Sequence, residues 1–218
     1  MEYFEYSVIE IEYLKSRDPV LKQVIEQIGI IKRAVIPDSF AALVNSIVGQ
    51  QISTKAHQTI WQRINNSFSP ITPANFKSLS AEELQKCGIT MKKAHYIKEI
   101  TRRIISDQLD LERLADLSNE EVIEQLCELP GIGRWTAEMI LTFSLQRKDI
   151  ISYSDLAILR GMRMVYHHQR ITPQLFTKYK RRYGPYATIA SLYLWAVAAG
   201  AIPELKDYAP KSKNNVRI

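Results

Sequence analysis

The chain has 218 residues, enough to bury a core either as one domain or as two small lobes that share a cleft. Lysine and arginine number 29 against 23 acidic residues, and the resulting net charge of +6 suits a nucleic acid partner as well as it suits an ordinary basic protein. The two cysteines, Cys87 and Cys127, belong to no CxxC or Cys/His cluster, which argues against a zinc site, an iron–sulfur cluster and a disulfide framework.

The N-terminal residues, MEYFEYSVIEIEYL, carry acids where a secretory signal carries lysine or arginine, and no apolar run in the chain is long enough to span a bilayer. We therefore expect a cytoplasmic protein with no membrane partner. The same stretch alternates in a way that predicts a strand in the first dozen residues. We assign residues 1–37 to an N-terminal segment that packs on a helical body.

Most of the chain carries apolar residues at helical spacing, and roughly ten helices are predicted, so the expected fold class is all-α. Ser53 is the start signal of one helix. Two other helices open with a capping box, in which two side chains satisfy the first free amides. The capping boxes are Ser80 with Glu83 and Ser118 with Glu121. A basic tail, residues 201–218, ends in KSKNNVRI, which we expect to be mobile.

The stretch CELPGIGRWTAEM, residues 127–139, lies between two predicted helices. Pro130-Gly131 stops the first helix and the second begins near Gly133, which makes a helix–hairpin–helix. The two glycines permit backbone angles closed to other residues and let a large ligand lie against the main chain. The second helix directs its free amides and positive dipole end outward, where a phosphate is stabilised, and Arg134 could add a charge-assisted contact. A glycine turn also closes many helix pairs that bind no ligand.

The second helix of the hairpin has an apolar side, and a further helix follows it. The residues expected on that apolar side are Trp135, Met139, Ile140 and Phe143. Ser154-Asp155-Leu156 then opens the next helix, so a carboxylate lies at a helix start. Asp155 is either simply an N-cap, the commonest role of aspartate at that position, or a group with a chemical task.

Four segments in this order resemble the helix–hairpin–helix (HhH-GPD) superfamily of DNA base-excision glycosylases, in particular its alkylbase branch, the 3-methyladenine DNA glycosylase II type. They are SIVGQQISTKAHQTI at 46–60, LPGIGRWTAEMI at 129–140, Asp155, and PYATIASLYLWAVAAG at 185–200. The resemblance implies an all-helical, two-lobed glycosylase region over residues 38–200, with DNA gripped across the cleft. A β-rich N-terminal domain found in some members is expected here as a short remnant at most.

The resemblance also implies an activity. It is that of a monofunctional glycosylase of base excision repair, which flips alkylated purines of the 3-methyladenine and 7-methylguanine type out of duplex DNA and hydrolyses their glycosidic bond. Bifunctional members carry a nucleophilic lysine where this chain has Trp135, and indole has no amine that could form a Schiff base. We therefore expect an intact abasic site and no lyase step. A related glycosylase for another damaged base and a non-catalytic DNA-binding module are the alternatives.

In this resemblance Asp155 is the catalytic residue, because its negative charge would balance the positive charge that develops on the deoxyribose. Trp195 matches the pocket tryptophan of the branch and would attract a cationic alkylated base, although a core residue is the alternative. Trp135 is expected as a second wall of the base pocket. Met139 stands where close relatives have a tyrosine, which leaves the range of lesions open.

Gln51 occupies the place of the side chain that fills the gap left by the flipped base, or else it and Gln50 only stabilise the local turn. The residues expected to contact DNA are Gly131, Ile132, Gly133, Arg134, Thr136, Gln51 and Ser53. The resemblance implies no required cofactor, but it implies that hairpin carbonyls can hold Na⁺ or K⁺. These carbonyls would be those of Cys127, Leu129 and Ile132. The expected partner is duplex DNA with damaged bases, bound by a monomer that in a prokaryote associates with the nucleoid.

Some other charged residues have weaker assignments. Lys92 and Lys93 follow the Gly88 turn and could form a second phosphate contact. Together with Lys148 they are also the amines that could in principle replace the missing lysine. Glu138 is an alternative carboxylate, although it has no match to the catalytic position.

Overall fold

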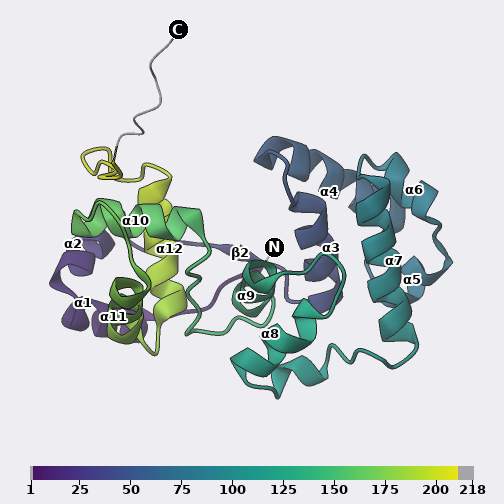
Figure 1. Ribbon diagram of the computed structural model, residues 1–218, viewed down its shortest axis with the longest axis horizontal. Coiled ribbons are helices and arrows are strands. Elements are labelled where there is room, and N and C mark those ends of the chain that lie inside the picture. The colour runs from purple at the N-terminus through teal and green to yellow at the C-terminus, as the bar shows by residue number, and fades with distance from the viewer. Residues whose placement is uncertain (1, 211–218) are drawn as a thin grey trace, which may run out of the picture. The chain divides into compact units, whose positions relative to one another are not determined.

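The computed structural model describes residues 2–210. In this range the chain forms twelve α-helices, one 3-10 helix and two strands of two residues each (Figure 1). The all-α prediction is confirmed. No helix in the described range is long and apolar enough to cross a membrane. The described chain divides into two compact units: residues 3–34 together with residues 147–210 form the first unit, and residues 35–146 form the second.

The first unit contains five helices. They are α1 (Val8–Arg17), α2 (Pro19–Ile28), α10 (Leu156–Tyr166), α11 (Pro173–Tyr183) and α12 (Ala187–Ala198). All four other helices pack against α12, and Figure 1 shows α12 crossing α10. Because it is covered from several sides, α12 is apolar around most of its circumference and buries most of its residues.

The predicted N-terminal strand is wrong for most of its length. The strand β1 (Glu2–Tyr3) pairs with β2 (Ala34–Val35), but α1 already begins at Val8. Ser7 caps α1, and the Glu10 carboxylate accepts the Ser7 backbone amide at 2.9 Å, which completes a capping box. These local hydrogen bonds stabilise a helix in a stretch whose apolar residues alternate.

A buried carboxylate anchors α10 within the first unit. Asp18 caps α2, is fully buried, and accepts hydrogen bonds of 2.9 Å from the Tyr166 hydroxyl and from the Arg182 guanidinium. A buried charge is costly unless it is paired and hydrogen-bonded, so these bonds hold α10 and α11 to the junction of α1 and α2. Burial also raises the pKa of the Tyr166 hydroxyl well above its usual value.

The second unit contains seven α-helices and the 3-10 helix. They are α3 (Ser39–Gly49), α4 (Thr54–Phe68), α5 (Pro73–Ser78), α6 (Ala81–Lys86), α7 (Met91–Ile105), η1 (Arg113–Ala115), α8 (Asn119–Cys127) and α9 (Arg134–Phe143). Helices α3, α5 and α6 all pack on α7, and α9 packs on both α3 and α8. The predicted capping boxes at Ser80 and Ser118 and the cap at Ser53 are confirmed.

The two compact units are divided at residues 34–35 and 146–147, and the predicted boundaries at residues 37 and 200 stay predictions. Residues 3–34 share a unit with residues 147–210. The predicted tail begins inside that unit, where the Arg163 guanidinium donates two hydrogen bonds of 2.7 Å to the Asp207 carboxylate. The stretch KSKNNVRI, expected to be mobile, lies outside the described residues.

Candidate functional site

The predicted helix–hairpin–helix is present in the second unit. Helix α8 ends at Cys127 and α9 begins at Arg134, and the Ile132 amide closes the loop between them by donating to the Leu129 carbonyl at 3.1 Å. Gly133 is the N-cap of α9 and has no side chain with which to cap it. A helix N-terminus without a capping side chain can accept an anion at its first amides.

The two glycines of the hairpin have different roles. Gly131 has a φ of +80°, and a Cβ atom there would lie 2.3 Å from Cδ2 of Tyr96. Gly133 has a φ of −102°, which any residue adopts, and a Cβ atom there would meet nothing within 4 Å. The fold therefore requires glycine at 131, whereas glycine at 133 leaves open space over the main chain at the start of α9.

Arg134 lies on the surface of the hairpin and forms hydrogen bonds to two carboxylates. Its Nη1 and Nη2 atoms donate to the Glu120 carboxylate at 2.7 and 3.0 Å, and its Nε donates to Glu138 at 3.2 Å. The hydrogen bonds to Glu120 are the main reason why the pKa of Arg134 is raised above its usual range. The Arg134 and Glu120 side chains are 55% and 59% exposed, and such a pair contributes little stability. A phosphate could thus replace Glu120 as partner, and this contact stays a prediction.

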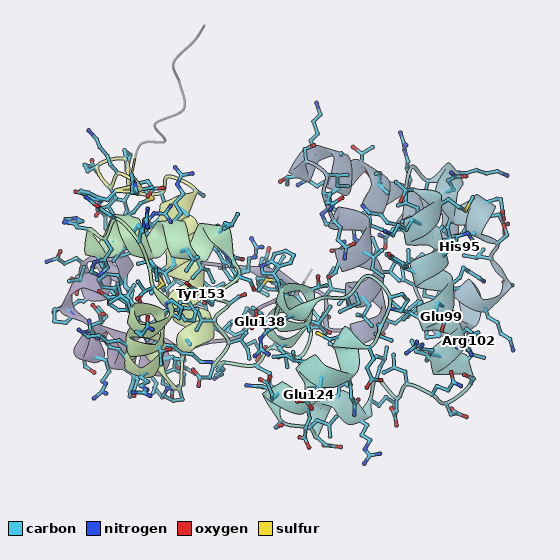
Figure 2. The ribbon with its side chains drawn as sticks, in the orientation of Figure 1. His95, Glu99, Arg102, Glu124, Glu138 and Tyr153 are labelled. Atoms are coloured by element: carbon cyan, nitrogen blue, oxygen red, sulfur yellow. The ribbon has the colours of Figure 1, made fainter. Side chains whose placement is uncertain are left out.

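Helix α9 packs with a different face than its apolar pattern predicts. Trp135 is 44% exposed, whereas Thr136 and Ala137 are buried together with Ile140, so the placement of Trp135 on the packing side is wrong. The exposed indole offers an aromatic surface to a ligand. The carboxylate of Glu138, labelled in Figure 2, is nearly buried, and its Oε2 atom has no hydrogen-bond partner among the described residues.

The GQQIS segment forms the turn between α3 and α4. Gln51 is exposed and has a φ of +56°, a left-handed conformation that is uncommon for residues other than glycine. The Gln50 side-chain amide donates to the Gly131 carbonyl at 2.8 Å, so Gln50 links this turn to the hairpin. Ser53 caps α4 by accepting the Ala56 amide at 3.3 Å. The contacts of Gln51 and Ser53 with DNA stay predictions.

Asp155 belongs to the first unit and is the N-cap of α10. Its Oδ1 atom accepts the amides of Ala157 and Ile158, each at 2.9 Å, and the residue is 6% exposed. These two amides belong to the first turn of α10, whose N–H groups have no partners within the helix. Trp195 is half-buried on α12, the helix on which α10 packs, so it is not a fully buried core residue.

Two apolar residues that flank Asp155 were missed in the sequence. Leu156 is 81% exposed, and Tyr153, labelled in Figure 2, is 41% exposed. Leu156 falls outside the buried stripe of α10 that includes Ile158 and Met162, and this mismatch with the helical period is the signal that could have revealed it. A nearly buried carboxylate beside exposed apolar side chains is a surface suited to a sugar or a base.

A glycine sets the distance between the two helices that carry Asp155 and Trp195. A Cβ atom at Gly161 of α10 would lie 2.2 Å from the backbone oxygen of Leu194 on α12. Only glycine permits this crossing without a shift of backbone. No sequence pattern marks this position as a helix contact.

The profile of the HhH-GPD superfamily of base excision DNA repair proteins matches residues 44–185. The chain belongs to this superfamily. The match includes the GQQIS turn, the hairpin and Asp155, and it ends before Trp195. The recognition drawn from the four motifs is thereby confirmed, and so is the helix–hairpin–helix glycosylase fold.

Several HhH-GPD relatives are similar over most of the chain. DNA-3-methyladenine glycosylase 1 of Schizosaccharomyces pombe is 33% identical over 176 residues, which cover 78% of this chain and 75% of that protein. The crystal structure of a DNA-3-methyladenine glycosidase from Bacillus halodurans superposes with a TM-score of 0.82 at 33% identity, covering 95% of this chain and 97% of that one. The Schizosaccharomyces pombe 3-methyladenine DNA glycosylase in complex with abasic DNA gives a TM-score of 0.77 at 29% identity, covering 87% and 96%.

The binding of Na⁺ or K⁺ by the carbonyls of Cys127, Leu129 and Ile132 stays a prediction. The Leu129 carbonyl accepts the Ile132 amide, and a carbonyl oxygen has a second lone pair that could meet a metal ion. Among residues 2–210 there is no group of three or more His, Cys, Asp or Glu side chains that could hold a metal. Any ion at the hairpin would therefore depend on main-chain oxygens.

The two hairpin glycines can be separated by alanine substitution. Gly131→Ala should lower the free energy of unfolding by about 1–3 kcal/mol, because its Cβ would overlap the Tyr96 ring. Gly133→Ala should change it by less than about 0.5 kcal/mol. If phosphate approaches the main chain there, Gly133→Ala should nevertheless weaken binding to undamaged duplex several-fold. Urea unfolding and DNA titration measure the two effects. Equal DNA affinity of Gly133→Ala and wild type would exclude this approach.

Proposed function

We propose that this HhH-GPD protein is a DNA glycosylase of base excision repair that hydrolytically removes alkylated purines, of the 3-methyladenine and 7-methylguanine type, from duplex DNA. The similarity to DNA-3-methyladenine glycosylases over most of the chain supports this activity. The observation that carries the proposal is the nearly buried Asp155 carboxylate at the start of α10, which the superfamily match includes. A module that only bound DNA would need this side chain only as a helix cap, and asparagine would cap α10 equally well.

The proposed mechanism follows from the charge that develops in the reaction. As the bond between the sugar carbon and the base nitrogen breaks, its electron pair leaves with the base and the deoxyribose becomes positive. The Asp155 carboxylate stabilises that positive charge and accepts a proton from the water that adds to the sugar carbon. A purine alkylated on a ring nitrogen is cationic and leaves as a neutral base. Trp195, Trp135 and Met139 are the residues proposed to contact it after flipping.

We propose that the reaction stops at the abasic site. Trp135 carries no amine, and two of the three candidate lysines already have hydrogen-bond partners. Lys93 donates to backbone carbonyls, and Lys148 forms an ion pair with Glu10 that lowers the pKa of the Glu10 carboxyl to about 2. A lysine that attacks a sugar needs a free amine, and both of these side chains are engaged in contacts within the protein.

The test uses duplexes that each carry one defined lesion. Duplexes with an alkylated purine should release the free base, and the strand should remain intact until it is treated with hot alkali. Borohydride should trap no protein–DNA adduct, because trapping requires a Schiff base. A bifunctional glycosylase on its own substrate serves as the positive control for trapping.

Each other outcome selects a different function. A lesion-dependent protein band that shifts on a denaturing gel would reveal an amine at the sugar and overturn the monofunctional assignment. Release of only an oxidised or deaminated base would favour a related glycosylase for that lesion. DNA binding without release of any base would leave the non-catalytic module.

Duplex DNA with damaged bases is the partner that this activity requires. A monomeric state, the absence of a required cofactor and an optional Na⁺ or K⁺ at the hairpin belong to the same proposal. The cytoplasmic location, with association with the nucleoid in a prokaryote, stays a prediction.

A further inference from the structure

We propose that Lys93 and Gln50 form a clamp that holds the Gln50-Gln51 turn against the hairpin. Lys93 is then a positioning residue, which places the Gln51 side chain for insertion into the DNA duplex. It is not a phosphate contact. This inference rests on the proposed function, in which a side chain fills the gap left by a flipped base. All residues of the clamp lie in the second unit.

The Lys93 ammonium is directed at the end of α3. Its Nζ atom donates to the Val48 carbonyl at 2.9 Å and to the Gln50 carbonyl at 2.6 Å. The last carbonyls of a helix lack partners within the helix and carry the negative end of its dipole, so a cation is favourable there. Burial lowers the pKa of Lys93, as expected for an ammonium that is partly withdrawn from solvent.

The turn held by Lys93 also contacts the hairpin. The Gln50 side chain donates to the Gly131 carbonyl at 2.8 Å. Tyr96, one helical turn after Lys93 on the same face of α7, covers Gly131 so closely that no Cβ would fit. Helix α7 therefore contacts both the GQQIS turn and the hairpin loop, and it fixes the distance between two loops that are far apart in sequence.

The turn is restrained from a third side by α4. A Cβ atom at Gly49 would lie 3.1 Å from Cε1 of His57, so the turn packs directly on that imidazole. Gln51 keeps its left-handed φ of +56° in this setting. This conformation is uncommon for a residue other than glycine, but Asp107, Gln146 and His167 share it, so it does not by itself mark a site. Contacts of Lys93, Gln50 and His57 restrain the backbone that leads into Gln51.

Helix α7 offers a matched control for Lys93. Lys98 also donates to two backbone carbonyls, those of Phe76 and Lys77, each at 2.9 Å, at the end of α5. Its pKa is likewise lowered by burial. Lys98→Met therefore removes the same kind of interaction from the same helix but leaves the GQQIS turn untouched.

The experiment compares Lys93→Met with Lys98→Met in the full-length protein. For Lys93→Met, the preference for a duplex with a tetrahydrofuran abasic analogue over undamaged duplex should fall about fivefold or more, and the single-turnover excision rate by about tenfold or more, because misplacement of a positioning group is costly. Lys98→Met should keep the abasic preference and the excision rate within about twofold of wild type. Its melting temperature should fall by about as much as that of Lys93→Met. Lys93→Arg, which keeps the charge, should recover part of the preference.

Salt dependence separates a clamp from a phosphate contact. The slope of log affinity against log salt for undamaged duplex should be the same in Lys93→Met and wild type, whereas the loss of one phosphate contact would reduce it by about 1. That reduction would overturn the inference. So would an unchanged abasic preference in Lys93→Met, or an equal loss of preference in Lys98→Met.

Binding to the abasic analogue requires no base release, so it tests the clamp separately from the proposed catalytic function. If wild type releases no base yet prefers the analogue, and Lys93→Met loses that preference, the clamp stands and the proposed function fails. If wild type releases base and Lys93→Met releases it equally fast, the clamp fails and the function stands. Should Lys93→Met not fold, Gln50→Leu removes only the hydrogen bond to Gly131 and must show the same loss of preference.

Discussion

Replacing Asp155 by asparagine is expected to lower the single-turnover rate of base release by about 100-fold or more while leaving fold and DNA affinity intact. Asparagine is nearly isosteric with aspartate and is an equally good N-cap, so it can keep the two bonds that Oδ1 receives from the first turn of α10. Its amide is neutral and cannot balance the charge that develops on the sugar. The loss should therefore appear in the chemical step alone.

A second cap provides the control for this substitution. Asp38 is the exposed N-cap of α3 and accepts the Ala41 amide at 2.7 Å. Asp38→Asn makes the same chemical change at another helix start and should leave the excision rate within about twofold of wild type. An Asp155→Asn protein that retained more than about a tenth of the wild-type rate would place the chemistry on another group.

Gly161→Ala is expected to have the largest effect on stability of any substitution considered. The added methyl group would lie 2.2 Å from the Leu194 carbonyl oxygen and 2.8 Å from its carbon, and these are backbone atoms that cannot rotate away. Overpacking of this kind costs about 1–3 kcal/mol or more in the free energy of unfolding. In a chain of this size we expect the melting temperature to fall by about 4–10 °C.

Thermal and urea unfolding measure this effect, with Gly133→Ala as the control because its added methyl group meets nothing within 4 Å. The Gly161→Ala protein that remains folded should also excise more slowly than wild type, since the crossing of α10 and α12 places the helices of Asp155 and Trp195. If Gly161→Ala had the same melting temperature and urea midpoint as wild type, α10 and α12 would be able to move apart at little cost in free energy.

Features that depend on neighbouring residues could be predicted from the sequence. The capping boxes at Ser80 and Ser118, the hairpin around Gly131 and the cap at Asp155 all follow from hydrogen bonds within a few residues. The same local chemistry was overlooked at Ser7, where alternating apolar residues suggested a strand although a capping box starts α1. The family could be recognised because its motifs are of this local kind.

Contacts between distant residues decided the rest. Gln50 meets Gly131, Lys93 meets the end of α3, and Gly161 meets Leu194, yet none of these pairs has a spacing that any periodic pattern records. The apolar period of α9 likewise could not show that Trp135 is exposed while the smaller Thr136 is buried, because the burial of a residue depends on which neighbouring helix covers it. The sequence by itself determined where helices start and stop and which residue caps α10, because those preferences act over one helical turn. Only the tertiary structure decided which side chains brace the GQQIS turn and the hairpin and how closely α10 approaches α12, since packing depends on residues brought together from remote parts of the chain.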